Sequence, residues 1–244
     1  RAPADGYTFA VTTIAAAAVG PSLIEKMPYD PAKDMEPVTL LMSLPNLLVV
    51  HPSVPVTNLR ELIAYAKANP TKLRYGHPGA GTTPHLSGEL LKQQAGIQMQ
   101  GIPYRSSAQM TTDLLGGHYE VLFHNSSVLL PHAKGGAARV LGITSAERVP
   151  TLPDIPTIAE AGGLKGFSVN AWWGLHAPAG TPADIVAKVH ADVAAALAQP
   201  DVKAWIDGQG GVGGGDTPQA LRAFQAAEAQ KWRDLIRAAN IKAD

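Results

Sequence analysis

Tyr75-Gly-His-Pro-Gly-Ala-Gly-Thr-Thr-Pro-His85 joins a short β-type run to a helical pattern through a glycine-containing loop. The run from Leu73 to Gly76 predicts a strand, and apolar residues at helical spacing predict a helix over His85 to Ala95. Thr83-Pro84 marks the helix start, with threonine as N-cap and proline at the first helical position. A strand, a short loop and a capped helix in this order are the unit from which α/β folds are built.

The same alternation continues on both sides of this stretch. It favours a mainly parallel α/β sheet over a helical bundle or a β-sandwich. Two more helices are expected to begin at a Thr-Pro pair, at Thr181-Pro182 and at Thr217-Pro218. Further strands are predicted over Thr8 to Thr13, Leu47 to His51, Glu120 to Phe123 and Arg139 to Thr144, and further helices over Leu59 to Ala68, Ala183 to Ala198 and Gln219 to Ala239.

The composition narrows the class of protein. The 244 residues carry 20 basic and 20 acidic side chains, so no net charge attracts nucleic acid or an anionic membrane. Cysteine is absent, which excludes disulfides and thiolate metal sites but leaves the compartment open. No apolar run reaches the roughly 20 residues that span a bilayer, and no signal-peptide pattern opens the chain.

The glycine loop is the most informative candidate for a binding site. Main-chain amides at Gly79, Ala80 and Gly81 and at a helix start attract a carboxylate or phosphate, and the hydroxyl groups of Thr82 and Thr83 add donors. The loop also follows the carboxyl end of a strand, where open α/β sheets bind ligands. The alternative, that the glycines only form a tight turn, is equally compatible with the pattern.

A second candidate lies at Tyr104-Arg105-Ser106-Ser107, which places a positive charge and two hydroxyl groups at another strand-to-helix junction. An acidic ligand suits this set, but an exposed Arg105 with a serine as helix N-cap explains the same residues without a ligand. Trp172-Trp173 can line a pocket, although paired tryptophans more often brace a core.

Sequence motifs for cofactors and catalysis are absent. Pro84 stands where a dinucleotide fingerprint begun by Gly79 requires glycine or alanine, and no P-loop lysine follows. Neither a G-x-S-x-G elbow nor an H-E-x-x-H motif occurs, so no catalytic residue, metal ligand or cofactor is expected. His77, His85 and His124 lie near strand ends or helix starts, where a structural role is the more common one, and His124 is kept as a candidate.

The chain contains two longer motifs, Leu152-Pro-Asp-Ile-Pro-Thr-Ile-Ala-Glu-Ala-Gly162 and Trp173-Gly-Leu-His-Ala-Pro-Ala-Gly-Thr-Pro182. It also contains shorter ones at Ala4 to Thr8, Met27 to Pro31, Tyr75 to Leu91, Pro103 to Arg105 and Asp113 to Gly117. Together they resemble one family, the tripartite tricarboxylate transporter receptors, also called Bug proteins. The resemblance covers nearly the whole chain.

The resemblance implies a type II periplasmic binding-protein fold, in which two α/β lobes joined by two β crossovers hold a small organic acid between them. The crossovers are expected near Val49 to Pro52 and Ser168 to Trp172, so that lobe 1 takes residues 1–49 and 172–244 and lobe 2 takes residues 50–171. It also implies a noncatalytic periplasmic receptor, expected to be a monomer, that delivers its ligand to membrane permease subunits.

Ligand contacts carried over from the family lie mainly on βα loops of both lobes, and the site is expected to comprise Thr12, Thr13, Gly79, Ala80, Gly81, Thr82, Thr83, Tyr104, Arg105, Ser106, His124, Asn125 and Trp173. Two positions depart from the family pattern, because His77 replaces a usual serine and His124 a common aspartate. An imidazole in place of a carboxylate favours an extra ligand acid group over an ammonium. The expected ligand is therefore a small carboxylate without an amino group.

The family pattern also includes a strand, a glycine-rich loop and a helix before Ala4 to Thr8, so the first strand and helix of lobe 1 are expected to be missing. The sheet edge left unpaired would offer a dimer interface, as the alternative to a monomer. Two other functions stay open. One is a signalling or interaction protein that has lost ligand binding, and the other, with less support, is a small-molecule hydrolase, for which the sequence nominates no nucleophile and base in contact.

Overall fold

The computed structural model describes residues 2–243 of the chain. They form two compact units: unit 1 comprises residues 2–43 and 171–243, and unit 2 comprises Leu44–Asn170. The chain passes between the units twice, inside strand β2 (Met35–Val50) and at the start of strand β7 (Asn170–Pro178). The first passage precedes the 49/50 boundary expected from the sequence, because Leu47, Leu48, Val49 and Val50 already pair with strands of unit 2.

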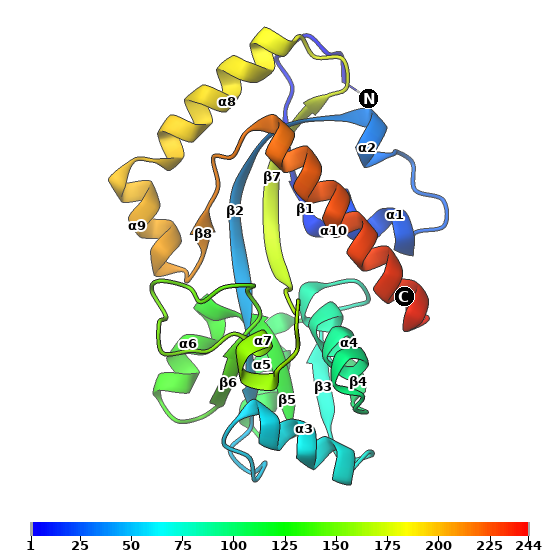
Figure 1. The fold of residues 1–244 in the computed structure, drawn as a ribbon, viewed down its shortest axis with the longest axis vertical. Coiled ribbons are helices and arrows are strands. Elements are labelled where there is room, and N and C mark those ends of the chain that lie inside the picture. Colours follow the sequence, from blue (N-terminus) through cyan, green and yellow to red (C-terminus); the bar gives the residue numbers. More distant parts are fainter. Residues whose placement is uncertain (1, 244) are drawn as a thin grey trace. The chain divides into compact units, whose positions relative to one another are not determined.

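Unit 1 combines a small sheet with helices. Strand β1 (Ala10–Thr13) pairs antiparallel with β7, β7 neighbours β2, and β2 pairs antiparallel with the short strand β8 (Val212–Gly213). Helix α10 (Pro218–Ala238) packs on the π-helix η1 (Ala15–Val19), which closely follows β1. The other helices of this unit are α1 (Gly20–Leu23), α2 (Pro31–Asp34), α8 (Ala183–Leu197) and α9 (Pro200–Gly208) (Figure 1).

Helix α10 forms because its apolar positions share one face. Leu221, Trp232 and Leu235 are among its buried residues and recur at helical spacing, while the other side faces solvent. Thr217 is its N-cap, accepting the Ala220 amide at 3.2 Å, and Pro218 is its first residue, as the sequence predicts.

The other two Thr-Pro pairs mark helix starts that differ by one residue from the prediction. Helix α4 (Thr83–Ala95) has Thr82 as its N-cap rather than Thr83, and α8 has Pro182 rather than Thr181. Thr82 donates its hydroxyl to the Gly79 carbonyl at 2.7 Å, and Thr181 donates to the Pro178 carbonyl at 2.8 Å. Their hydroxyl groups therefore bond to the preceding loops, and the pattern locates the helix start only to within a residue.

The sheet of unit 2 is mainly parallel, as the sequence predicts, except that β2 runs against its neighbours. Its strands lie in the order β6-β2-β5-β3-β4, with β3 parallel to β4 and β5, and β2 antiparallel to β5 and β6. Strand β2 enters from unit 1 and inserts between two strands that run the other way. The elements that complete unit 2 are α3 (Leu59–Ala68), β3 (Arg74–His77), α4, β4 (Gln100–Pro103), α5 (Ser107–Leu115), β5 (Val121–Asn125), α6 (Ser126–Lys134), β6 (Arg139–Ile143) and α7 (Ile158–Gly162).

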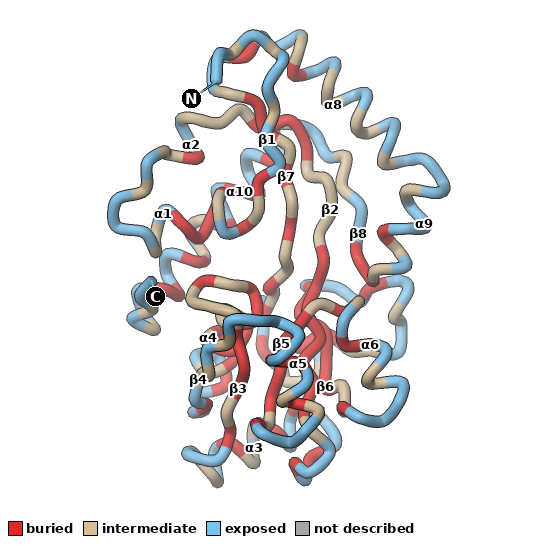
Figure 2. Tube along the Cα trace, turned by 180° about the vertical axis from the view of Figure 1, so that it is seen from behind, coloured by how far each residue is buried: buried red, intermediate tan, exposed pale blue. Residues whose placement is uncertain are grey.

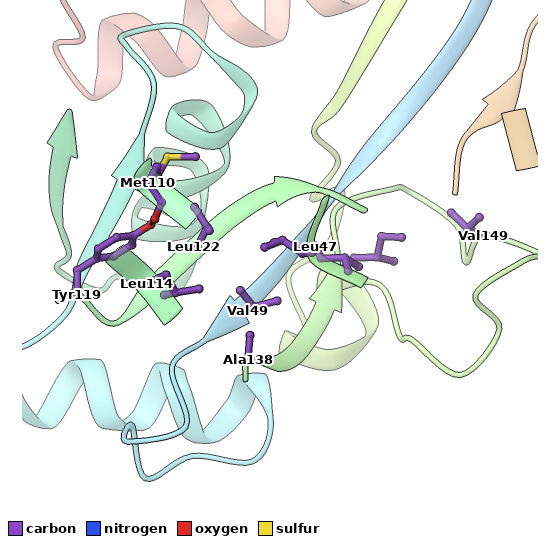
Figure 3. Packing of buried hydrophobic residues seen from close by; sticks show 10 residues of the cluster. Leu47, Val49, Met110, Leu114, Tyr119, Leu122, Ala138 and Val149 are labelled. Atoms are coloured by element: carbon purple, nitrogen blue, oxygen red, sulfur yellow. Dashed lines mark hydrogen bonds between the residues drawn. The ribbon is translucent and has the colours of Figure 1, made fainter. Parts of the chain in front are cut away.

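One hydrophobic core cluster of unit 2 includes residues of its sheet and of helix α5. Leu47 and Leu122 come from the neighbouring strands β2 and β5, and Met110 and Leu114 come from α5; all four are fully buried (Figure 3). Burying such a side chain contributes about 1.5–3 kcal/mol. Tyr119 joins the cluster and donates its hydroxyl to the Met110 carbonyl at 2.6 Å, so its one polar group is satisfied.

Burial is uneven among the helices. Strands β2, β3, β5 and β6 are largely buried, whereas α8 is exposed or half-buried except at Val186 (Figure 2). No helix in the described part of the chain is both long and apolar enough to cross a membrane.

Candidate ligand-binding site

The carboxyl ends of β3, β4 and β5 meet at one edge of the unit 2 sheet. Strand β3 is parallel to both β4 and β5, and β6 runs in the same direction as β5 because both are antiparallel to β2. We call this the strand-end edge. It brings together three segments that the sequence nominates: residues 79–83 after β3, residues 104–106 after β4, and residues 124–125 at the end of β5.

Two histidine rings accept hydrogen bonds from main-chain amides of the glycine loop. The Gly79 amide donates to Nδ1 of His77 at 3.3 Å, and the Gly81 amide donates to Nδ1 of His85 at 3.4 Å. The centroids of the two rings are 4.5 Å apart. A ring nitrogen accepts an N–H group only when it carries no proton, so both Nδ1 atoms are unprotonated. Gly79 and Gly81 have φ values of 132° and 75°, which favour glycine.

The expectation of free loop amides is thereby corrected at Gly79 and Gly81, since both already have acceptors. Ala80 is half-buried, and Thr83, the first residue of α4, is buried. The first amides of an α-helix have no acceptor within the helix, and its dipole is positive there. The start of α4, rather than the glycine loop, is therefore the feature that suits an anion here.

Residues 104–106 divide into one charged and two structural side chains. Tyr104 packs beside Tyr119, with 5.6 Å between ring centroids, and burial, helped by Asp113, raises the pKa of its hydroxyl to about 12. Ser106 caps α5 by accepting the Gln109 amide at 3.5 Å. Arg105 is exposed and has no ion-pair partner within residues 2–243. Its guanidinium is the charge that this segment offers to a ligand.

His124 is one of the residues that line a pocket of about 400 Å³ between α5 and α6. Its Nδ1 accepts the Asn125 amide at 2.7 Å, and Nε2 is buried with no hydrogen-bond partner in the described chain. Burial lowers the pKa of the ring, because it disfavours the charged form. His124 is therefore a neutral donor through Nε2–H. Asn125, the N-cap of α6, is half-buried and makes no side-chain capping bond.

Three polar residues near this edge were not predicted. Asn46 exchanges hydrogen bonds with Thr144, and it lies opposite Asn125 in the sheet. Buried side-chain oxygens of Asn46, Ser145 and Asn170 have no partner in the part of the chain that the structure describes. Such atoms are rare in native proteins and mark places where water or a ligand binds. The one signal in the sequence was Asn46, an amide within the apolar run of β2.

The remaining nominated residues lie in unit 1. Thr13 and Trp173 are register partners in the β1–β7 pair, and both are half-buried. Thr12 is buried, and its hydroxyl bonds to Nδ1 of His176 at 2.9 Å and to the Gly174 carbonyl at 3.3 Å. Thr13 and Trp173 are thus the more accessible members of this group.

Neither a metal centre nor a hydrolase site is built from these residues. Within residues 2–243, no three His, Asp or Glu side chains are grouped so that they could hold a metal ion. Thr12 and His176 pair a hydroxyl with an imidazole, but both are buried, and Nε2 of the ring bonds to the Gln225 amide oxygen at 2.9 Å instead of a carboxylate. A nucleophile needs a base that a substrate can also reach.

Comparison with solved structures identifies close relatives of this fold. An R. palustris protein described with adipate shares 38% identity and a TM-score of 0.85, covering 99% of this chain and 81% of that one. The Rhodopseudomonas palustris protein MatC with bound malate shares 32% identity and a TM-score of 0.78 over 96% and 81%. The periplasmic binding protein BugD shares 31% identity and a TM-score of 0.81 over 100% and 82%.

These matches confirm the predicted fold class, the mixed α/β fold of periplasmic solute-binding proteins. The family model described as "Tripartite tricarboxylate transporter family receptor" matches residues 1–241. Its members and these structural relatives are solute-binding receptors and not enzymes. The chain belongs to the tripartite tricarboxylate transporter receptor family.

Proposed function

We propose that this protein is a periplasmic receptor that captures a small organic carboxylate and delivers it to a membrane permease. The observation that carries the proposal is the strand-end edge of unit 2. There, the starts of α4 and α5, the exposed guanidinium of Arg105 and the neutral Nε2–H donor of His124 all favour an anion.

Two relatives support the choice of ligand class, since one structure is described with adipate and another with bound malate. Both compounds are small dicarboxylates without an amino group. We assign the main contacts to Thr83, Arg105, His124 and Asn125 of unit 2. Gly79, Gly81, Thr82 and Ser106 shape the edge, because their described hydrogen bonds join residues two to four positions apart in the chain.

Thermal unfolding against a ligand panel tests this proposal. The panel contains mono-, di- and tricarboxylates, amino acids and neutral sugars, with the diamide of each effective diacid as its uncharged control. A true ligand at a hundred times its Kd adds about 2.7 kcal/mol to the free energy of unfolding. Selective stabilisation by acids supports a carboxylate receptor. The proposal is contradicted if acids and their diamides stabilise the protein equally, or if no compound stabilises it.

Delivery to a permease needs a test in cells. A strain in which the gene for this chain is deleted should lose uptake of the radiolabelled acid identified by the panel. Restoring the gene should restore uptake, whereas a copy carrying Arg105→Gln should restore it less well at low acid concentration. Unchanged uptake in the deletion strain would contradict a role in transport.

A further inference from the structure

The conformation of the glycine loop depends on the protonation state of two histidines. Nδ1 of His77 accepts the Gly79 amide at 3.3 Å, and Nδ1 of His85 accepts the Gly81 amide at 3.4 Å. A neutral imidazole has one accepting nitrogen, whereas an imidazolium has only donors. Proton uptake by either ring therefore places an N–H group against the N–H group of a glycine, and that hydrogen bond is lost.

The two rings are close together and largely shielded from solvent. Their centroids are 4.5 Å apart, His77 is 7% exposed, and His85 is half-buried. Two like charges at such a distance disfavour each other, so protonation of one ring opposes protonation of the other. We therefore expect the pair to take up a single proton first, and that proton removes one of the two hydrogen bonds to the glycine loop.

The titratable groups beside the two rings belong to β3 and α4. The Tyr75 ring of β3 lies 5.8 Å from the His77 ring and 6.4 Å from the His85 ring, measured between centroids. Its hydroxyl donates to Glu89 of α4 at 2.6 Å, and Lys92 pairs with the same carboxylate at 2.7 Å. Helix α4 contains no further titratable residue. The charge of Glu89 is therefore balanced within the helix.

Strands β4 and β5 add no titratable group on this side of the sheet. Side chains alternate along a strand, and a β-carbon at Gly76 would lie 2.8 Å from a side chain of α5, so His77 points to the opposite face. His124, the one titratable residue of β5, shares a face with Leu122, the register partner of Gly76. Arg74, two residues before Gly76, also lies on the α5 side, and β4 contains no titratable residue.

We propose that His77 and His85 form a proton switch for the glycine loop, in which uptake of one proton by the pair releases a loop amide and adds a positive charge beside it. Both changes favour a bound anion. The inference rests on the proposed function and deepens it, because it adds regulation of the strand-end edge by pH. Carboxylate binding is coupled to proton uptake, and the affinity rises as the pH falls through the range in which the pair titrates.

Asparagine separates the two properties of each ring. Its side-chain oxygen takes nearly the position of Nδ1 and accepts a main-chain amide, but it does not titrate. The double variant His77→Asn/His85→Asn should therefore keep both hydrogen bonds to the glycine loop at every pH. His118→Asn, at an exposed position in unit 2, is the matched control and should behave as the wild type does.

NMR spectroscopy of the protein without added acid tests the switch itself. Spectra between about pH 8 and pH 5 follow the Gly79 and Gly81 amides and the ring nitrogens of the two histidines. In the wild type and in His118→Asn, the amide resonances should move along the titration curve of the rings, whereas in the double variant they should stay in place. Amide resonances that do not follow the rings in the wild type would overturn the switch.

Calorimetry tests its coupling to the ligand. We would measure Kd of the acid identified by the ligand panel at two pH values, for the wild type and for the double variant. The ratio of the two constants at one pH cancels the titration of the acid itself. Because one bound proton changes affinity by up to about tenfold per pH unit, the wild type should gain roughly 3- to 10-fold over the variant on acidification.

The possible failures are distinguishable. If the ratio of the two Kd values is the same at both pH values, or if the wild type loses affinity relative to the variant on acidification, the regulation by pH is overturned while the carboxylate receptor stands. If no acid binds the wild-type protein at either pH, the proposed function itself is overturned, and its regulation with it. The NMR titration decides in that case whether the two histidines still switch the loop.

Discussion

Glu228 is a carboxylate enclosed by aromatic side chains in unit 1. Its Oε2 accepts the indole N–H groups of Trp172 at 3.2 Å and Trp232 at 3.0 Å, and Lys231 pairs with Oε1. The residue is buried, and so are both tryptophans. A buried charge is stable only when its hydrogen bonds are satisfied, so these contacts act together. They attach the start of β7 to α10.

Replacing Glu228 by alanine should therefore be costly. We expect Glu228→Ala to lower the free energy of unfolding by about 3 kcal/mol, because two buried indole donors lose their acceptor. Urea unfolding followed by circular dichroism measures the loss. Glu25→Ala, at an exposed position, is the control and should stay within about 0.5 kcal/mol of the wild type. A similarly small change for Glu228→Ala would show that the cluster adds nothing to stability.

His176 makes stability depend on pH. Burial lowers the pKa of its ring below the ordinary value of 6.5, and burial lowers that of His124 as well. On acidification the unfolded chain therefore takes up protons before the folded chain does, so the free energy of unfolding falls. The loss begins near pH 6.5 and continues down to the folded-state pKa.

We expect this loss to approach ~1.4 kcal/mol per pH unit for each of the two histidines. His176→Gln, which keeps a neutral donor, should have a shallower decline between pH 7 and 5 in urea unfolding experiments. His118→Leu, at an exposed position, should retain the wild-type slope. An equally steep decline in His176→Gln would show that other groups govern acid sensitivity.

At the scale of elements, helix α7 has a complete capping box. Thr157 accepts the Glu160 amide through its hydroxyl, and Glu160 accepts the Thr157 amide, both at 3.1 Å. Thr157→Ala should destabilise unit 2 by about 1 kcal/mol, whereas Thr157→Ser should keep most of the stability because the hydroxyl remains. Thermal unfolding of both variants measures this. Equal melting temperatures for the two would contradict a capping role.

Local patterns predicted where elements lie better than how they pair. Leu59–Ala68 matches its predicted helix, and β1, β3, β5 and β6 lie within or beside their predicted runs. The antiparallel direction of β2 was not predicted, since no local pattern tells whether a strand runs parallel or antiparallel to neighbours that are distant in sequence. The helix starts predicted at Thr83 and Thr181 each differ by one residue, and the hydroxyl groups of Thr82 and Thr181 bond to the residues before the helices.

The candidate site was predictable to a similar extent. Residues 79–83, 104–106 and 124–125 were predicted as site residues because each segment follows or ends a predicted strand. The structure brings these segments to one edge of the unit 2 sheet. The partners of their polar groups could not be read locally. His77 and His85 accept hydrogen bonds from the Gly79 and Gly81 amides, which the glycine pattern suggested were free. Asn46 forms a hydrogen bond with Thr144, which is distant in the sequence.

At the scale of the whole molecule, tryptophan fluorescence reports on only one of the units. All four tryptophans, at positions 172, 173, 205 and 232, lie in unit 1. Strand β2 belongs to both units, because Ser43 pairs in unit 1 while Leu47 pairs in unit 2. We therefore expect the units to unfold together, with coincident transitions by fluorescence and circular dichroism.

A substitution in the core of unit 2 tests this coupling. Leu122→Ala should cost about 2–5 kcal/mol and should lower the fluorescence midpoint as much as the circular dichroism midpoint. Lys67→Ala, at an exposed position in unit 2, should move neither. A fluorescence midpoint unchanged by Leu122→Ala would show that the units unfold independently.

The placement of unit 2 within the chain has a consequence for the order of biosynthesis. Its residues, Leu44–Asn170, are contiguous, whereas unit 1 is assembled from both ends of the described chain. Synthesis proceeds at roughly 5–20 residues per second from the amino end. The segment that forms unit 2 is therefore synthesised completely before β7, the strand that pairs with β1 in unit 1. At that stage the nascent chain contains every residue of the unit 2 core but only the first part of unit 1.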